Sequence, residues 1–371
     1  MARRIGIITG DTGMFSNGLI QNAYFLYKTY KNLGIPVDLL CYNDKYTKLD
    51  SMDVEIKTIS EDPTVFPLQE YRTIITVAKG ISKDLYARCK EHKVHVVGFI
   101  CGNSLMLHLE EFYIDGKARN TVVGKERPVD ELWYIGSFQF QKTYLELMRG
   151  VKAYPVPHLW SPALIEHETV HRFKDSADAL LYTPRTHITP KIEIVILEPN
   201  MNIVKTSLIP MMAAEHLFLK SPSLINQVFV FNFPTKSPHT EHLLDNLAVK
   251  SKIRRFKSLH IAEILMYFNR KDTTPIFVSH QLYNEWNYLY YELMYYGFPL
   301  VHNSNAFKDY GYYYSDMDIA GCSSKIEEAF DYHGRRCLSQ RDANRAFLKT
   351  IDPEGMESQT AFRNMLLSVE D

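Results

Sequence analysis

The sequence predicts an α/β protein made of two Rossmann-like, doubly wound units. Short apolar strands alternate with helical segments along most of its 371 residues, which is the pattern of parallel sheets covered by helices on both faces. That length exceeds one typical domain of about 100 to 150 residues and suits two of them. A segment with three prolines, residues 153–162, separates two alternating series, and we interpret it as the crossover between the units.

The first series starts with an apolar strand at residues 4–9, a loop at 10–18 and a helix at 19–33 that ends before Gly34. The other strands expected here are short apolar runs: 37–41, 73–77, 94–100 and 131–135. Helical patterns lie between them at 82–91 and 141–147. About 160 residues suffice for one such domain, so residues 1–160 are assigned to the first unit.

The second unit is expected at residues 161–345. Its strands are again predicted from short apolar runs: 191–197, 228–231, 253–256, 275–279 and 298–301. Helical patterns separate the last three strands, at 261–268 and at 283–296, and the second pattern ends at Gly297. Two more helical patterns follow at 343–350 and 356–367, and residues 346–371 are assigned to a terminal segment of their own.

Composition excludes several classes of function. The net charge is -1, with 42 Lys and Arg against 43 Asp and Glu, so no overall field would recruit nucleic acid or an anionic membrane. Five cysteines without paired CxxC spacing disfavour a disulfide framework and a zinc site, and they fit a reducing, cytoplasmic compartment. No apolar run approaches the roughly 20 residues that span a bilayer, so any membrane contact would be peripheral.

Polar residues follow two strands of the second unit. Ligands of doubly wound sheets bind beyond the carboxyl ends of the strands, which places Ser279, His280, Asn284 and Asn303 at the ligand-facing edge. Glu292 is the one carboxylate in the aromatic half of the helix at 283–296. An ionised carboxylate among tyrosines needs a partner, and two ribose hydroxyls would be a suitable one. A solvated helix face is the alternative.

A second group follows the strand at 191–197. Glu198 and Asn200 enter a loop there, before a helical segment that contains Lys205. Backbone donors, the helix dipole and an ammonium together bind a diphosphate well. The alternative is a capped helix with a surface lysine.

In the first unit, the loop after the first strand carries Asp11, Ser16, Asn17 and Gly18, and a glycine there permits close approach of the backbone to a ligand. The loop lacks the GxGxxG spacing, and the next strand ends without a ribose-binding acid. Both facts disfavour a nicotinamide enzyme.

Two further polar residues are candidates for acceptor contacts. Asn103 follows the strand at 94–100, where it could touch sugar hydroxyls or only satisfy turn and helix-end amides. His158 lies at the expected junction of the units, where packing beside Trp160 is the structural alternative.

The helix with Glu292, followed by Gly297 and Pro299, resembles the donor-sugar motif of GT-B glycosyltransferases, in which two glutamates separated by seven residues precede a G-x-P turn. In that family the second glutamate holds the donor ribose and the first lies near the transferred sugar, which implies these roles for Glu292 and Asn284. The first glutamate is thus an asparagine here, with Glu285 one position away. Either Asn284 contacts the sugar as an amide or the loop register differs.

Residues 194–207 resemble the GT-B diphosphate motif. Lys205 matches its lysine, but the usual arginine has no match because Asn200 or Asn202 stands in its place. Backbone amides, His280 or Asn287 would then complete the clamp. As a set, the strings EPN..IVK, SHQ..NEWNYLYYE and PLVHNS resemble a family of bacterial and large-virus proteins placed near these enzymes.

The resemblance implies a GT-B fold, with two Rossmann-like lobes facing across a cleft and the C-terminal helix of residues 346–371 crossing back to the first lobe. It implies sugar transfer from a nucleotide-diphosphate sugar, of open base, to a glycan hydroxyl without a required metal. The implied donor-binding residues are Glu198, Asn200, Lys205, Ser279, His280, Asn287, Glu292 and Asn303. The implied acceptor-binding or sugar-binding residues are Ser16, Asn17, Gly18, Asn103 and His158.

For the catalytic step, Asp11 and His280 are the candidate general bases of an inverting route, with Asn284 near the transferred sugar. Two alternatives stay open at this point. One is a nucleotide-sugar epimerase or hydrolase on the same fold, and the other is a non-enzymatic glycan-binding or scaffold protein with a degenerate donor site.

Overall fold

The computed structural model describes residues 3–15, 18–49, 52, 54–62, 66–77, 79–113, 128–184, 191–233, 238–271 and 273–370. The chain forms two compact units. Unit 1 consists of residues 1–161 and 348–371, and unit 2 consists of residues 162–347. Among the described residues, no helix is both long enough and apolar enough to cross a membrane.

Unit 1 is built on a parallel sheet of seven strands in the order β3-β2-β1-β4-β5-β6-β7. The strands are β1 (Arg4–Ile8), β2 (Val37–Cys41), β3 (Ile56–Thr58), β4 (Tyr71–Thr76), β5 (His95–Ile100), β6 (Glu131–Ile135) and β7 (Ala153–Val156). The strand order reverses between β1 and β4, which makes their carboxyl ends the topological switch point of this sheet.

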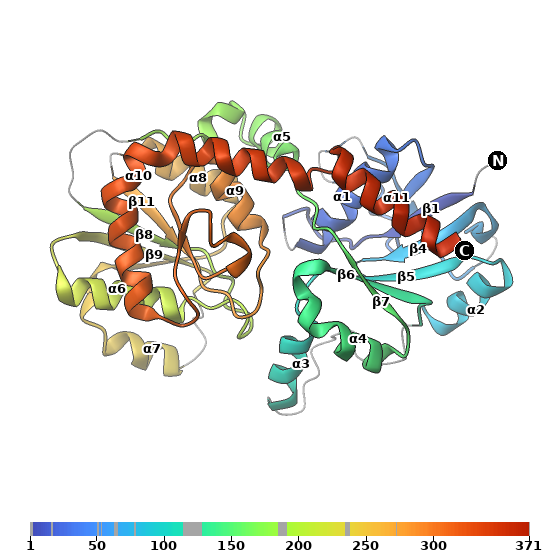
Figure 1. Cartoon of the computed structure of the whole chain (residues 1–371), viewed down its shortest axis with the longest axis horizontal. Helices are drawn as coiled ribbons and strands as arrows, with labels where there is room; N and C mark the ends of the chain where they lie inside the picture. Colours follow the sequence, from blue (N-terminus) through green and yellow to red (C-terminus); the bar gives the residue numbers. More distant parts are fainter. Residues whose placement is uncertain are drawn as a thin grey trace. The chain divides into compact units, whose positions relative to one another are not determined.

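Helices cover both faces of this sheet. They are α1 (Gly18–Asn32), α2 (Lys83–Glu91), α3 (Ser104–Tyr113), α4 (Lys142–Arg149) and α11 (Met356–Glu370). Helices α1 and α11 lie together on one face, and α2 and α4 lie on the other (Figure 1). A Cβ atom at Gly6 in β1 would lie 2.5 Å from the Cδ1 atom of Leu40 and 2.7 Å from that of Ile74, so a larger residue there would force these two side-chain ends to shift.

Unit 2 contains a parallel sheet of six strands in the order β10-β9-β8-β11-β12-β13. The strands are β8 (Ile192–Ile196), β9 (Ile225–Phe231), β10 (Ile253–Phe256), β11 (Thr274–Val278), β12 (Leu300–His302) and β13 (Tyr312–Tyr313). The order reverses between β8 and β11, so this sheet has its switch point there.

The helices of unit 2 are α5 (Ala163–His171), α6 (Leu208–Lys220), α7 (Pro238–Asp245), α8 (Ile261–Arg270), α9 (Tyr288–Tyr296) and α10 (Ile319–Leu348). In Figure 1, α6 and α7 lie on one face of the sheet, and α8 and α9 lie on the other. Buried residues of β8, β9, β11, α6 and α10 form one apolar core. The described residues also form six short 3-10 helices: Leu68–Glu70, Gly136–Gln141, Ala177–Leu180, Ala248–Lys252, Asn305–Phe307 and Lys349–Ile351.

The predicted class, two Rossmann-like units with doubly wound parallel sheets, is confirmed. Three of the predicted elements are wrong in detail. Residues 153–156 form edge strand β7 instead of a crossover, since an edge strand tolerates a proline such as Pro155. Helix α9 begins at Tyr288 and not at Tyr283, because Tyr283 has a φ of 48° and Asn287 is an extended N-cap. The pattern at 343–350 is the end of the 30-residue helix α10.

Candidate functional site

The polar residues predicted at the ligand edge of unit 2 meet at the switch point between β8 and β11. Glu198 follows β8, and Ser279 and His280 follow β11 directly. The Glu198 carboxylate accepts hydrogen bonds at Oε1 from the Ser279 hydroxyl and, at 3.2 Å, from the His280 backbone amide. Ser279 Oγ also lies 3.0 Å from the Tyr290 hydroxyl, which comes from α9. A polar network therefore joins both switch-point strands to α9.

This network leaves one carboxylate oxygen unused. Glu198 is only 1% exposed, and its Oε2 atom has no hydrogen-bond partner in the described part of the chain. Burial raises the pKa of Glu198 to about 7, against the opposing effects of the Ser279 hydrogen bond, Lys205 and the His280 amide. Burial likewise lowers the pKa of Lys205, against the opposing charge of Glu198. Within the described residues, the Lys205 ammonium makes no hydrogen bond and no ion pair.

The loops that carry these residues are tied to each other. Lys205 forms an antiparallel backbone bridge with Gln281, and the Leu282 amide donates to the Val204 carbonyl at 2.8 Å. The loop after β8 is thus fixed against the loop after β11, and Lys205 is held at the carboxyl edge of the sheet.

Asn200 shapes the loop between β8 and α6. Its φ of 52° is left-handed, and its Oδ1 atom accepts hydrogen bonds from the Ser207 amide at 2.8 Å and the Ser207 hydroxyl at 2.9 Å. Its Nδ2 atom donates to the carbonyls of Glu198 and Asn232. The Asn200 side chain is therefore committed to holding the loop that delivers Lys205.

His280 and Asn287 also have internal partners. The Tyr314 hydroxyl donates to the Ser279 carbonyl at 3.1 Å and lies 2.9 Å from His280 Nδ1, which makes Nδ1 the protonated nitrogen and leaves Nε2 as the acceptor. Burial lowers the pKa of His280 to about 4, so the imidazole is neutral at pH 7. The Asn287 side chain caps α9 by accepting a hydrogen bond from the Leu289 amide.

Glu292 lies in the second turn of α9 and is buried, at 5% exposure. Burial raises its pKa to about 8, and no other cause contributes. Within the part of the chain that the structure describes, the carboxyl group accepts no hydrogen bond. A buried carboxyl without a partner is unusual, because each such group costs free energy that a ligand could recover.

The two residues considered for the first glutamate position, Asn284 and Glu285, have different hydrogen-bond partners in the segment before α9. Glu285 is committed: its Oε2 atom accepts hydrogen bonds from the Ser304 hydroxyl at 2.8 Å and the Ala306 amide at 3.0 Å. Asn284 is buried, and its Nδ2 atom donates to the Gln281 side-chain carbonyl. Asn284 therefore keeps its side-chain oxygen available, whereas Glu285 does not.

Asn303 lies just after β12 and binds the backbone of the neighbouring loop. Its Oδ1 atom accepts from the Gln281 amide, and its Nδ2 atom donates to the Gln281 carbonyl, both at 2.9 Å. The structure thus places Asn303 beside the other residues but uses its side chain to fix Gln281.

The sequence prediction did not include Gln281, Tyr290 and Tyr314. A signal for Gln281 was available, because it stands only three residues beyond β11. Tyr290 and Tyr314 gave no such signal, since their hydroxyl partners come from distant parts of the chain.

The predicted residues of unit 1 that the structure describes come from separate segments of the chain. Asp11 lies 3.4 Å from the Lys79 ammonium and also 3.4 Å from Asn43 Nδ2, and a hydrogen bond from its own backbone, followed by Lys79, lowers its pKa. Ser16 and Asn17 lie outside the described residues. Gly18 is the first residue of α1.

The remaining two candidates of unit 1 are buried. Asn103 accepts a hydrogen bond from the Met106 amide at 3.0 Å at the start of α3, as the helix-end alternative predicted. Burial lowers the pKa of His158 to about 3, so this imidazole is neutral at pH 7.

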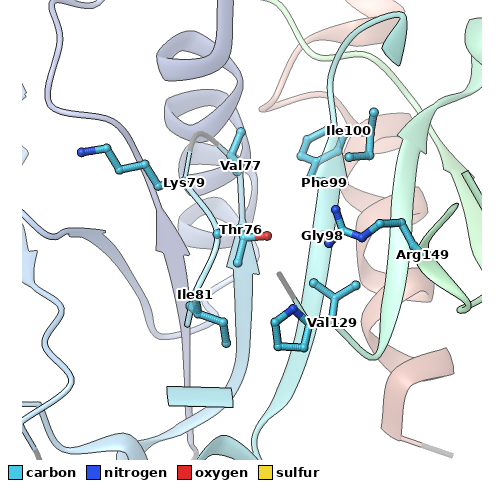
Figure 2. Close-up of a pocket in the computed structure, with 11 residues that line it drawn as sticks. Thr76, Val77, Lys79, Ile81, Gly98, Phe99, Ile100, Val129 and Arg149 are labelled. Atoms are coloured by element: carbon cyan, nitrogen blue, oxygen red, sulfur yellow. The ribbon is translucent and has the colours of Figure 1, made fainter. Parts of the chain in front are cut away.

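Unit 1 has a small hollow over β4 and β5, with a volume of about 40 Å³. Its lining is mostly apolar, with Phe99 and Val129 among the walls. Arg149 reaches toward Gly98 from the end of α4, whereas the Lys79 ammonium points away (Figure 2). None of the predicted site residues lines this hollow. Among the described residues, no group of three or more His, Cys, Asp or Glu could hold a metal ion.

Comparison with solved structures identifies the fold. A glycosyltransferase from Rickettsia africae matches with a TM-score of 0.59 and 13% identity over 99% of this chain and 98% of that one. Sucrose-phosphate synthase from Thermosynechococcus elongatus matches with a TM-score of 0.59 and 10% identity over 100% and 99%. Anabaena HepE in complex with UDP and glucose matches with a TM-score of 0.56 and 9% identity over 98% and 99%. The chain thus has the GT-B fold of these proteins.

Sequence comparison adds a family. Residues 4–366 match the family described as "Protein of unknown function (DUF2827)". No curated protein matches the sequence significantly.

Proposed function

The chain belongs to the DUF2827 family, and from this premise and its GT-B fold we propose that it transfers a sugar from a nucleotide-diphosphate sugar to a hydroxyl group of a glycan. The observation that carries the proposal is the buried carboxyl of Glu292, which has no partner within the described residues and lies on the helix that follows switch-point strand β11. The two ribose hydroxyls of a nucleotide would supply the missing hydrogen bonds.

Lys205 supports the same assignment from the neighbouring loop. Its ammonium has no anionic partner within hydrogen-bonding distance among the described residues, and it lies just before the amino terminus of α6. In the proposed reaction the bond between the anomeric carbon and the diphosphate oxygen breaks, and its electron pair stays on the diphosphate. Lys205 and the positive end of the α6 dipole would stabilise that charge as it develops.

The acceptor hydroxyl forms the new bond to the anomeric carbon and loses its proton. We keep Asp11 and His280 as candidate acceptors of that proton, with Asn284 as a sugar contact through its side-chain oxygen. The pKa of His280, about 4, makes it a weak base, and the lowered pKa of Asp11 keeps that group ionised. No step in the proposal is assigned to a metal ion.

We propose UDP-sugars as the donors to test first, because the comparable structures include HepE in complex with UDP-glucose and an alpha-glucosyltransferase in complex with UDP. For the acceptor we propose a glycan or glycoconjugate, with Gly18, Asn103 and His158 of unit 1, together with Ser16 and Asn17, near its binding site. All five cysteines are unpaired, which fits a reducing compartment, and we propose the cytoplasm.

The test is nucleotide binding by wild-type protein and two variants. UDP, GDP, ADP, CMP and TDP are screened by thermal shift, where a ligand at 100 times its Kd adds about 2.7 kcal/mol of stability. We expect one nucleotide to raise the wild-type midpoint, and Lys205→Ala and Glu292→Gln to reduce that shift. Lys220→Ala is the matched control, since this lysine ends the same helix α6 and pairs with Glu327 at the surface.

Turnover with and without acceptor separates the enzymatic alternatives, and nucleotide binding separates both from a glycan-binding protein. If UDP is released from UDP-glucose faster with a glycan acceptor present, and the glucose is found on that acceptor, the protein is a transferase. Release of UDP and free glucose that does not depend on the acceptor indicates a hydrolase. Absence of binding by all five nucleotides at millimolar concentration contradicts the donor site and favours a glycan-binding protein.

A further inference from the structure

We propose that Gln281 is a donor-binding residue whose side-chain Nε2 atom donates a hydrogen bond to the diphosphate, beside Lys205. This inference rests on the proposed function and deepens it, because it names the group that completes the diphosphate site. The sequence offers Lys205 but no arginine at the expected position after β8. One ammonium leaves most of the diphosphate oxygens without a protein donor, so a second donor is needed nearby.

The backbone bridge puts Gln281 next to Lys205. The two residues are direct partners in an antiparallel bridge, and directly opposed residues of such a pair project their side chains to the same side. The Gln281 amide and the Lys205 ammonium therefore lie on one side of the paired loops, at the carboxyl ends of β8 and β11. That edge of a doubly wound sheet is where ligands bind.

The orientation of the Gln281 side chain leaves its Nε2 hydrogens without an acceptor among the described residues. Asn284 donates to Oε1 of Gln281, which fixes the side-chain amide with its oxygen toward Asn284. Nε2 is buried and has no hydrogen-bond partner among the residues that the structure describes, while the backbone amide and carbonyl of Gln281 are both bound by the Asn303 side chain. A held residue with a buried, unpartnered donor requires an explanation, and a ligand oxygen provides one.

The other candidates for completing the clamp are already engaged. His280 is neutral at pH 7, and its Nδ1–H group donates a hydrogen bond to the Tyr314 hydroxyl oxygen. The Asn287 side chain caps α9, and the Asn200 side chain holds the loop before α6. Of the polar side chains in these two loops, Gln281 thus combines a place beside Lys205 with an unused donor.

The experiment compares Gln281→Leu and Gln281→Glu with wild type by calorimetric titration of UDP and of uridine. Gln281→Glu keeps an oxygen for Asn284 and removes the donors but adds a negative charge, so measuring it at 50 mM and 500 mM salt separates the loss of the donors from charge repulsion, which salt screens. We expect the Kd for UDP to rise about tenfold or more in both variants, since hydrogen bonds to charged groups are the strong ones. The Kd for uridine, which lacks phosphate, should stay unchanged.

Two results would overturn the assignment: unchanged UDP affinity in both variants, or equal weakening of UDP and uridine, which would mean that Gln281 only holds the loop. If the wild type binds no nucleoside diphosphate, both the proposed function and the role of Gln281 are contradicted. If the wild type binds UDP and both variants bind it equally well, only the role of Gln281 is contradicted and the proposed function stands.

Discussion

At the scale of single residues, the site is defined by polar groups that the fold buries without satisfying. Around the switch point of unit 2, Glu198 Oε2 and Gln281 Nε2 are buried without a hydrogen-bond partner among the described residues. The Glu292 side chain on α9 is 5% exposed, and its carboxyl accepts no hydrogen bond from those residues. Each is costly in the unliganded protein, because burial disfavours charge and removes water as a partner. Such groups persist where function needs them, and here they form a set that nucleotide, diphosphate and sugar could satisfy.

Glu292→Gln is expected to stabilise the unliganded protein. Because burial raises the Glu292 pKa from 4.5 to about 8, the folded state holds a proton that the unfolded state releases. Wild-type stability should therefore fall by roughly 1.4 kcal/mol per pH unit between about pH 5 and pH 8, and flatten above that. Glutamine removes this slope, so the gain of the variant should grow across the same window.

Thermal unfolding at several pH values measures this gain. Glu263→Gln, on the exposed side of α8, is the control and should show no pH-dependent gain. An equal pH slope in wild type and Glu292→Gln would contradict the raised pKa.

Glu198 should make nucleotide binding depend on pH. The Glu198 pKa is about 7, so ionisation above that pH adds a negative charge next to Lys205 and the proposed diphosphate site. UDP affinity is expected to fall as pH rises from 6.5 to 8.5, and Glu198→Gln should flatten that fall. Titration of UDP across this range, with wild type and variant side by side, cancels the ionisation of UDP itself. If UDP affinity falls with pH equally in Glu198→Gln, a group other than Glu198 causes the pH dependence.

At the scale of elements, short loops and helix-capping residues position the side chains of the proposed site. The loop between β8 and α6 depends on Asn200, and α9 starts where Asn287 caps it and ends at Gly297 with a φ of 80°. That positive φ is one that a glycine adopts without strain. These local devices fix where Lys205 and Glu292 stand relative to the strands.

Asn200→Ala is expected to destabilise unit 2 by about 1 to 3 kcal/mol and to weaken UDP binding through Lys205. The variant loses the hydrogen bonds to Ser207, Glu198 and Asn232 and puts an alanine at a φ of 52°. Asn200→Gly relieves the backbone strain only, so its smaller loss isolates the side-chain contribution. Chemical unfolding checks both, and equal stability of Asn200→Ala and wild type would refute the role.

At the scale of the whole molecule, the end of the chain belongs to unit 1 although it follows unit 2 in sequence. Phe362 of α11 is fully buried, with ring centroids 6.2 Å from Tyr30 and 6.2 Å from Trp133. Lys28 pairs with Glu354 at 3.1 Å. The last helix therefore contributes to the core of the first unit, and residues at the two ends of the sequence stabilise the same fold.

Phe362→Ala should destabilise unit 1 selectively, by about 3 to 5 kcal/mol, because it leaves a cavity between α1, β6 and α11. Hydrogen exchange followed by peptide is the measurement. Exchange should rise in α1 and β6 and stay unchanged in α8 and α9 of unit 2. Leu367→Ala, at a position of the same helix that is 53% exposed, is the control. A uniform rise through both units would show instead that the chain unfolds as one body.

The sequence by itself determined the class of the fold, and it predicted the sheet edge at which the proposed site lies. The alternation of apolar strands and helices predicted two parallel sheets, and β10 was predicted with the bounds that the structure gives it. Glu198, Ser279 and His280 were predicted to lie at one edge because ligands of doubly wound sheets bind beyond the carboxyl ends of the strands, and this depends only on strand direction. Turn chemistry was less reliable: five residues before Tyr288 resembled the helix in periodicity but adopt an irregular loop.

Only the tertiary structure decided which of those polar residues are free for a ligand. Asn200, Asn287, Asn303 and Glu285 have the same chemistry as candidates, but their hydrogen bonds are used by loops, caps and backbone. Gln281 became visible through a bridge to Lys205 across 76 residues of sequence. The physical reason is that local patterns fix secondary structure, whereas burial and hydrogen-bond satisfaction depend on partners from distant segments.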